Sequence, residues 1–290
     1  MASSRACPIC RNPTDLAGRK CGSRTQREFT LRRCHDCGFA FVEDPWTDYA
    51  QIYDQAYYQG QGSDPLVDYA FEFAHPTKTI RQYEWRGVAR AVTRQAPPPV
   101  KWLDFGCGNG GLIRYLRDHG HERVFGFDTG AWSEKARQAG LPILKESDLS
   151  SHRGTFDVLT AVEVIEHVVD PMALLRHWRA LVKPGGLLFL TTGNADKAPK
   201  DFLSWSYVQP EIHVSYFTPR AMALALRQTG FEPLFPGRTA GWTDIIRFKI
   251  LKNLRVRNAN LIEQILPWPL LVWLADGRYQ ISAYPIGRAI

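Results

Sequence analysis

Short apolar runs alternate with amphipathic stretches through the middle of the chain. Val100–Phe105 and Phe156–Val162 are mostly apolar, which is typical of strands buried on both faces. Pro171 and Pro219 each mark the start of a predicted helix, because proline is tolerated in the first turn of a helix. This alternation predicts an α/β fold. The other expected strands are Val124–Asp128, Pro142–Lys145, Leu187–Thr192, Phe231–Phe235 and Arg278–Pro285, and the expected helices are Leu112–His119, Ser133–Ala139, Pro171–Arg179 and Pro219–Thr229.

A cluster of glycines in Trp102–Gly111 (WLDFGCGNGG) joins the first of these strands to a helix. Such a turn leaves backbone N–H groups free at the start of the helix and lets a ligand approach the main chain. Gly106, Gly108 and Gly111 also fit the G-x-G-x-x-G dinucleotide fingerprint, which keeps a nicotinamide oxidoreductase open. Asp104 would crowd a pyrophosphate. It suits a cationic, phosphate-free ligand such as S-adenosylmethionine.

Four motifs in order carry a resemblance to the class I S-adenosylmethionine-dependent methyltransferases. They are Asp104–Gly110 (DFGCGNG), Phe127-Asp128, Phe156–Pro171 (FDVLTAVEVIEHVVDP) and Leu181–Thr192 (LVKPGGLLFLTT). The similarity runs from about Val100 to Phe231. It implies a Rossmann-like fold with a mostly parallel seven-stranded sheet, whose last strand is antiparallel at the edge. It also implies S-adenosyl-L-methionine as the cofactor.

The cofactor would be held along the carboxyl ends of the strands. Asp128 ends the second strand about 20 residues after the glycine turn, where an acidic residue can accept both ribose hydroxyls. The resemblance places Asp148 at the adenine amino group, Leu149 beside the ring and Glu163 near the methionine half. The expected cofactor-binding residues are Asp104, Gly106, Cys107, Gly108, Gly110, Asp128, Thr129, Asp148, Leu149 and Glu163.

The acceptor pocket is expected around two histidines. The resemblance places His167, after Glu166, at the floor of this pocket, and Glu211–Pro219 resembles an H-x-S-Y-F-[ST] stretch of related enzymes. Sugar C-methyltransferases carry a Glu-His pair there, but Ile212 precedes His213 in this chain, which speaks against deprotonation of a sugar carbon. We expect His213, and after it His167, as the catalytic base; the alternative is that they only shape the loop or cap a helix. The expected acceptor-binding residues are Tyr57, Tyr58, His167, Trp205, Tyr207 and His213.

Two C-x₂-C pairs near the N-terminus, Cys7/Cys10 and Cys34/Cys37, have the spacing of a tetrahedral zinc site. Four protein ligands leave no open position, so the predicted Zn²⁺ is structural. Disulfides and unligated cysteines are the alternatives. We predict a zinc ribbon over residues 1–44, an aromatic-rich linker or lid over 45–96, the cofactor-binding core over 97–236, and a helical insertion with the last strand over 237–290.

The formal charge of +7 raises the question of a nucleic-acid substrate. Much of the excess lies near the two ends, and the predicted rim of the cleft is acidic. Residues 245–274 combine a basic helix with an apolar segment, which could contact a membrane peripherally or simply cap the core. No secretory signal and no apolar run of about 18 residues is present, so a cytoplasmic protein is expected. The acids on the predicted rim are Asp148, Glu163, Glu166, Asp170 and Glu211.

These observations predict methyl transfer to a small-molecule acceptor on oxygen, carbon or nitrogen. A sugar, a nucleotide-sugar or another biosynthetic intermediate fits the resemblance. A zinc-ribbon RNA methyltransferase is the main alternative, followed by a non-catalytic module that binds the cofactor. Neither the acceptor nor the oligomeric state follows from the sequence.

Overall fold

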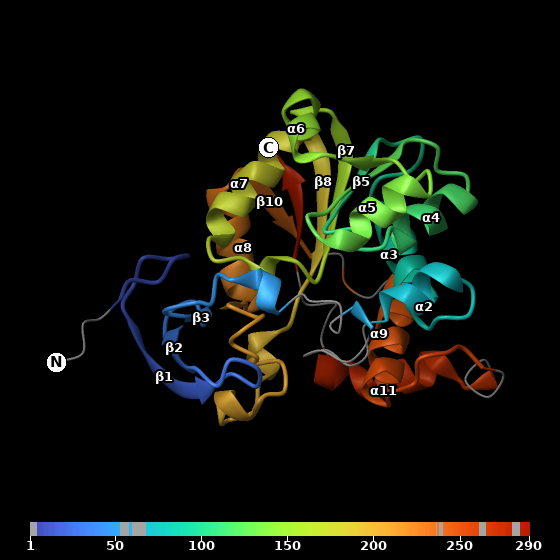
Figure 1. Ribbon diagram of the computed structural model, residues 1–290. Coiled ribbons are helices and arrows are strands. Elements are labelled where there is room, and N and C mark those ends of the chain that lie inside the picture. The colour runs from blue at the N-terminus through green and yellow to red at the C-terminus, as the bar shows by residue number, and fades with distance from the viewer. Residues whose placement is uncertain are drawn as a thin grey trace.

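The described residues form two sheets, one of seven strands and one of four, and both can be followed in Figure 1. In the large sheet the strand order is β10-β11-β8-β7-β4-β5-β6. In the small sheet the order is β1-β2-β3-β9. The computed structural model describes residues 5–52, 58–59, 68–235, 237, 240–260, 265–279 and 285–290 of the 290-residue chain.

The large sheet is parallel except for one strand. β11 runs antiparallel to both β8 and β10, so the predicted Rossmann-like sheet with an antiparallel last strand is confirmed. The predicted position of that strand is wrong. Residues up to Tyr279 belong to a helix, and the strand is interior because it pairs on both sides, which leaves β10 at the edge. The strands are β4 (Trp102–Phe105), β5 (Val124–Phe127), β6 (Ile143–Leu144), β7 (Phe156–Val162), β8 (Val182–Thr191), β10 (Phe231–Leu234) and β11 (Ile286–Ala289).

Helices cover both faces of this sheet. In Figure 1, α7 and α8 lie on one face, and α3, α4 and α5 lie on the other. Asp170 and Thr218 cap α7 and α8 from the residue before each proline, so both helices begin where the sequence predicts. The helices are α2 (Tyr69–Ala74), α3 (Arg81–Gln95), α4 (Gly111–Asp118), α5 (Ala131–Gln138), α6 (Glu146–Leu149), α7 (Pro171–Leu181), α8 (Pro219–Gln228), α9 (Ala240–Asn253) and α11 (Trp268–Tyr279), with 3₁₀ turns η1 (Tyr49–Gln51), η2 (Ser150–His152), η3 (Ile165–His167), η4 (Ala195–Lys197) and η5 (Phe202–Ser204).

The basic helix α9 packs against α3 instead of facing solvent. Gly87 and Gly241 meet where the helices cross, and a side chain on either would strike the other's backbone. The Arg247 guanidinium is buried and lies 3.7 Å from the centroid of the Tyr83 ring. α9 is therefore a cap on the core. Within the segment expected to contact a membrane, α11 exposes apolar side chains that include Trp273. The membrane contact stays a prediction. No helix in the described part of the chain is both long and apolar enough to cross a bilayer.

The small sheet contains the N-terminal strands and one strand from the core. β3 pairs with β9, which places Ala40 opposite Tyr216 and Phe41 opposite Ser215. Its inner side chains, including Phe29 and Tyr216, are fully buried. The cysteine-bearing segment is thus joined to the core through a shared sheet. The strands are β1 (Thr14–Cys21), β2 (Glu28–Cys34), β3 (Ala40–Val42) and β9 (Ser215–Tyr216).

Candidate active site

The glycine turn between β4 and α4 needs glycine at three positions. Gly106, Gly108 and Gly110 have φ values of 81°, 52° and 77°, a region that side chains disfavour. A side chain on Gly106 would also strike Val164, and a Cβ on Gly108 would lie 2.9 Å from the Tyr69 hydroxyl. Neighbouring side chains therefore pack directly against the backbone of the turn. A cleft lies there, and its lining includes Arg81, Glu84, Trp85, Asp104, Gly106 and Gly108.

Asp104 lies at the end of β4 within this cleft and is 5% exposed. Its carboxylate accepts a hydrogen bond from the Thr160 hydroxyl (2.8 Å). Burial nevertheless raises the pKa of Asp104 to about 7. A carboxylate held in a cavity at this cost suits a ligand that brings its own positive charge. The residues of the cleft therefore fit the ammonium and sulfonium groups of S-adenosylmethionine.

Asp128 braces the turn from the end of β5. One carboxylate oxygen accepts the Gly108 N–H (2.9 Å) and the other accepts the Gly130 N–H (2.6 Å). Each oxygen keeps a second lone pair, so the predicted bidentate contact with a ribose remains chemically open. Thr129 is exposed beside it. Burial, with the nearby charge of Asp128, raises the pKa of Tyr58 to about 12.

Tyr58 lies beside Gly130 and Asp128, so it is closer to the predicted ribose contact than the sequence suggests, and its expected contact with the acceptor stays a prediction. Its ring lies 5.4 Å from that of Tyr69, which in turn packs edge-on against Trp132. Tyr57 lies outside the described residues. Asp148 accepts hydrogen bonds from the Lys145 N–H and the Ser147 hydroxyl and so caps α6, while Leu149 is buried; their contact with adenine stays a prediction.

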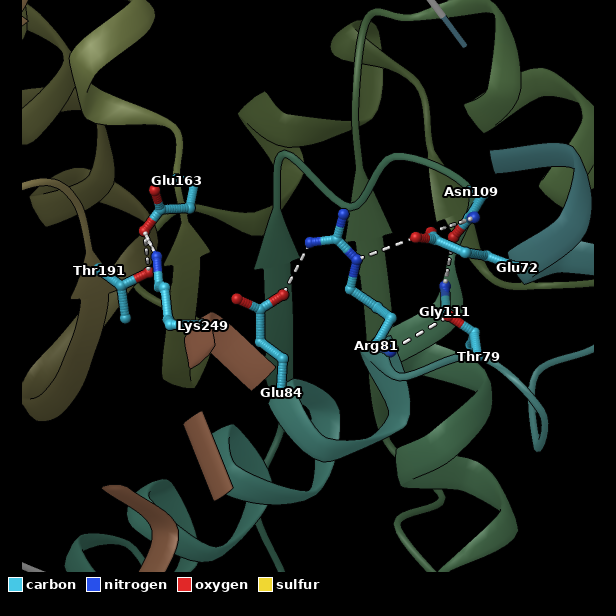
Figure 2. A network of polar contacts seen from close by, with 9 residues as sticks. All are labelled: Glu72, Thr79, Arg81, Glu84, Asn109, Gly111, Glu163, Thr191 and Lys249. Atoms are coloured by element: carbon cyan, nitrogen blue, oxygen red, sulfur yellow. Dashed lines mark hydrogen bonds and ion pairs between the residues drawn. The ribbon is translucent and has the colours of Figure 1, made fainter. Parts of the chain in front are cut away.

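Arg81 is a cation in the lining of the cleft, and the sequence did not predict it as a site residue. Its guanidinium lies between Glu72 (3.1 Å) and Glu84 (2.8 Å), as Figure 2 shows. Glu72 also accepts a hydrogen bond from Asn109, which holds the Gly111 N–H at the start of α4. In the sequence, Arg81 and Glu84 resemble an ordinary pair on the surface of a helix.

Glu163 begins a second cluster at the end of β7. It has a positive φ of 54°, which is strained for a residue with a side chain. Its carboxylate accepts from Thr191 (3.1 Å) and pairs with Lys249 of α9 (2.7 Å; Figure 2). Burial opposes ionisation, but Lys249 outweighs it and lowers the pKa of Glu163 to about 2. Glu163 is thus an anion, and Lys249 is a site residue that sequence reasoning assigned to the basic surface of a helix.

Glu166 is a buried carboxyl next to this anion. The Tyr207 hydroxyl donates to one of its oxygens (2.6 Å), and the other oxygen has no hydrogen-bond partner in the described part of the chain. Burial and the neighbouring charge of Glu163 raise the pKa of Glu166 to about 8. Glu166 is therefore mostly protonated at pH 7, unlike Glu163 three residues before it.

His167 and His213 face each other, with ring centroids 4.9 Å apart. His167 donates from Nδ1 to the Ile212 carbonyl (2.8 Å), and His213 donates from Nδ1 to the Tyr207 carbonyl (2.7 Å). In the neutral form of each ring, these bonds leave the lone pair on Nε2. Tyr207 stacks on His213, and Trp205 stacks on Tyr207. Four of the predicted acceptor-binding residues thus form one cluster.

The predicted acidic rim is only partly real. Glu211 points away from the cluster and binds the loop between β1 and β2, and Asp170 caps α7. Asp148 caps α6. Each of these carboxylates satisfies backbone N–H groups, which is the commonest structural use of an acid at a turn or helix start. Only Glu163 and Glu166 lie in the acceptor cluster.

The model of the methyltransferase domain family matches residues 78–234, just over half of the chain. The chain belongs to the methyltransferase domain family. A ubiquinone biosynthesis O-methyltransferase from Bordetella avium is 34% identical over 151 residues, which is 45% of this chain and 61% of the relative. A protein of the same name from Cereibacter sphaeroides is 32% identical over 161 residues, 48% of this chain and 64% of its own length. The chain thus covers less than two thirds of these relatives.

Solved structures of methyltransferases are similar to this chain at low sequence identity. One from Haloferax volcanii, in complex with the activator Trm112, is 20% identical over 77% of this chain and 97% of its own, with a TM-score of 0.48. Burkholderia thailandensis 1,6-didemethyltoxoflavin-N1-methyltransferase is 20% identical over 69% of this chain and 87% of its own, with a TM-score of 0.44. At this identity the likeness concerns the fold alone.

The four cysteines lie outside the stretch that matches the methyltransferase domain. Their sulfur atoms lie within 4.8 Å of one another, with Cys7 3.6 Å from Cys37 and Cys10 3.4 Å from Cys34. These separations are too long for disulfides, whose S–S bonds measure about 2.05 Å. They suit a tetrahedron of thiolates with Zn–S bonds of about 2.3 Å. The set therefore fits a structural Zn²⁺.

Proposed function

We propose that this chain is an S-adenosylmethionine-dependent methyltransferase that methylates a hydroxyl group of a small biosynthetic molecule. One observation carries the proposal. A buried carboxyl, Asp104, faces a cleft whose floor is a glycine turn, and Asp128 braces that turn from the next strand. This combination suits a ligand with a cationic end and a sugar, and its two carboxylates disfavour a pyrophosphate, which is itself an anion.

Each residue of the cleft would bind a different group of the cofactor. Asp104 would hold the ammonium group, Arg81 the carboxylate of the same amino acid, and Asp128 the two ribose hydroxyls. When bound, the cofactor supplies a methyl group on a positively charged sulfur. Most of the rate should come from holding acceptor and methyl in line, so rigid placement matters more than any single proton transfer.

On the acceptor side, His213 is the best placed base. Its Nε2 carries the lone pair, and burial, with His167 beside it, lowers the pKa of His213 to about 3. The ring is therefore neutral and able to accept the proton of a hydroxyl. Because an imidazolium would be costly there, the proton should move only as the acceptor oxygen forms its new bond. The anion of Glu163 would stabilise the charge that develops.

His167 is the second candidate, since its tautomer is set in the same way. Glu163 is less suitable as a base because Lys249 and Thr191 already engage its carboxylate, and Glu166 is protonated near neutrality. Trp205 and Tyr207 supply flat apolar surface that suits a ring-shaped acceptor. The names of the matched relatives favour oxygen over carbon or nitrogen as the methylated atom.

The cofactor is tested first, by calorimetry with S-adenosylhomocysteine and, as a contrast, NADH. We expect heat of binding with the former and none with the latter. Radiolabelled methyl transfer is then measured on a panel of phenols, catechols, sugars and nucleotide-sugars, with amines and carbon acids beside them. Binding of NADH alone would overturn the proposal, and labelling only of amines or carbon acids would overturn the choice of a hydroxyl.

A further inference from the structure

Glu211 makes a structural contact that plays no part in the proposed reaction. It lies in the stretch that carries His213, yet it is 3% exposed and points into the cysteine-bearing module. Its two carboxylate oxygens accept hydrogen bonds from three successive residues between β1 and β2. The donors are the backbone N–H groups of Ser23 (2.9 Å), Arg24 (3.1 Å) and Thr25 (2.6 Å) and the hydroxyls of Ser23 (3.2 Å) and Thr25 (2.7 Å).

This contact requires an anion. Burial alone would favour the neutral acid, but the donors of Thr25, Arg24 and Ser23 outweigh it and lower the pKa of Glu211. Glutamine offers one oxygen, and its NH₂ group would face N–H donors. The isosteric Glu211→Gln change therefore loosens the contact while keeping the shape of the side chain.

The other end of the same segment is held by the small sheet. The Val42 N–H donates to the Val214 carbonyl (3.0 Å), and β9 follows directly. The Thr218 hydroxyl donates to the carbonyl of Cys37 in the second cysteine knuckle (2.6 Å). Residues 211–218 thus touch the cysteine-bearing module at three separate points.

Between these points lie the bonds that orient the two histidines. The Ile212 carbonyl accepts Nδ1–H of His167, and the Val214 N–H donates to the Glu166 carbonyl (2.7 Å). The His213 N–H donates to the Gln209 carbonyl (2.8 Å). A shift of the segment would break the Ile212 bond and move the His213 ring against His167.

We propose that Glu211 is a positioning residue, through which the loop between β1 and β2 fixes the orientation of His213 and His167. The cysteine-bearing module is then one wall of the acceptor site rather than a separate docking domain. The inference rests on the proposed function for its effect on catalysis, but its structural part does not.

The structural part is tested without acceptor or cofactor, by the exchange of the histidine ring protons in ¹⁵N NMR. His167→Gln and His213→Gln variants assign the two Nδ1–H signals. We expect both signals to be protected in the unaltered protein and to exchange at least tenfold faster in Glu211→Gln, with S-adenosylhomocysteine affinity unchanged. Glu232→Gln, an exposed carboxylate on β10, is the matched control and should change neither. Unchanged ring exchange in Glu211→Gln would overturn the proposal, and so would an equal loss of cofactor affinity.

With an acceptor in hand, Glu211→Gln should lower kcat by about 10²-fold, because a small misplacement of reacting groups has a cost of that order. The cofactor KM should not move. If ring exchange quickens but no methyl transfer is found for any variant, the proposed function fails and the positioning role stands. If transfer proceeds at the unaltered kcat in Glu211→Gln, the positioning role is wrong and the proposed function survives.

Discussion

The cofactor side and the acceptor side of the cleft are assembled in different ways. The cofactor side is mostly local, because Asp104, the glycine turn and Asp128 lie within one β-α-β unit. The acceptor side takes Glu166 from η3, the turn that follows β7, and His213 from a distant loop. It takes Lys249 from α9 and its support from the N-terminal strands. A local site is readable as a motif, whereas a site assembled from distant segments depends on packing. A substitution on one side should therefore impair that side and leave the other intact.

Loss of the metal should give the largest difference between the two sides, because it should impair methyl transfer and spare cofactor binding. Cys34→Ser removes one of four ligands from a buried cluster. We expect metal content to fall from about one Zn²⁺ per chain to a small fraction, because a structural site needs all four ligands. Methyl transfer should fall about 10²-fold or more as the acceptor wall loosens. S-adenosylhomocysteine affinity should stay within about threefold of the unaltered value, since the residues proposed to bind it, Asp104, Arg81 and Asp128, lie outside the cysteine-bearing module.

Metal analysis, calorimetry and a transfer assay on the same sample check this prediction. Cys21→Ser is the control, because Cys21 is exposed at the end of β1 and away from the cluster. Equal collapse of cofactor binding and transfer would mean that the two sides form a single cooperative unit.

His213→Ala probes the acceptor side alone. We expect turnover to fall by about 10²–10⁴-fold, the usual contribution of a positioned base. Cofactor affinity should be preserved, since His213 contacts Tyr207 and His167 and not the glycine turn. Single-turnover kinetics with saturating cofactor measure the effect. His177→Ala, exposed on α7, is the control, and unaltered turnover in His213→Ala would pass the role of base to His167.

Asp128→Ala probes the cofactor side alone. It removes the proposed acceptor for two ribose hydroxyls and also the carboxylate that accepts the N–H groups of Gly108 and Gly130. At roughly 1.5 kcal/mol for each hydrogen bond to a charged group, affinity should weaken by about 10²-fold. Calorimetry with S-adenosylhomocysteine measures the affinity, and Asp118→Ala at the exposed end of α4 is the control. The ring-proton exchange of His213 should stay as in the unaltered chain, and a change there would undermine the separation.

The same contrast explains what the sequence could predict. The strands before the last one, the helix starts at Pro171 and Pro219, the glycine turn and Asp128 follow from local patterns, and the structure has them. Arg81 and Lys249 were missed because their charges look like surface charges until helices α3 and α9 pack together. Glu211 was read as an acid of the cleft, and nothing local shows that its donors lie almost 190 positions earlier in the chain. The last strand was misplaced because its pairing on both sides, with β8 and β10, is long-range.

The smallest expected effect concerns pH, and it tests whether Asp104 acts as a counter-ion. With a pKa of about 7, Asp104 is about one tenth ionised at pH 6 and nine tenths at pH 8. The neutral acid cannot pair with an ammonium group, so S-adenosylhomocysteine should bind about tenfold more tightly at pH 8 than at pH 6. Calorimetry at the two pH values measures this difference.

Asp104→Asn is the matched variant, because the amide keeps the shape and can still accept from Thr160. Its affinity should be lower at pH 8 and nearly the same at the two pH values. The titration of Glu166 lies on the acceptor side and should leave this profile unchanged, so a Glu166→Gln variant should keep the slope of the unaltered chain. If Asp104→Asn retained the slope while Glu166→Gln abolished it, the buried charge that recognises the cofactor would belong to the acceptor cluster, and the division between the two sides would have to be redrawn.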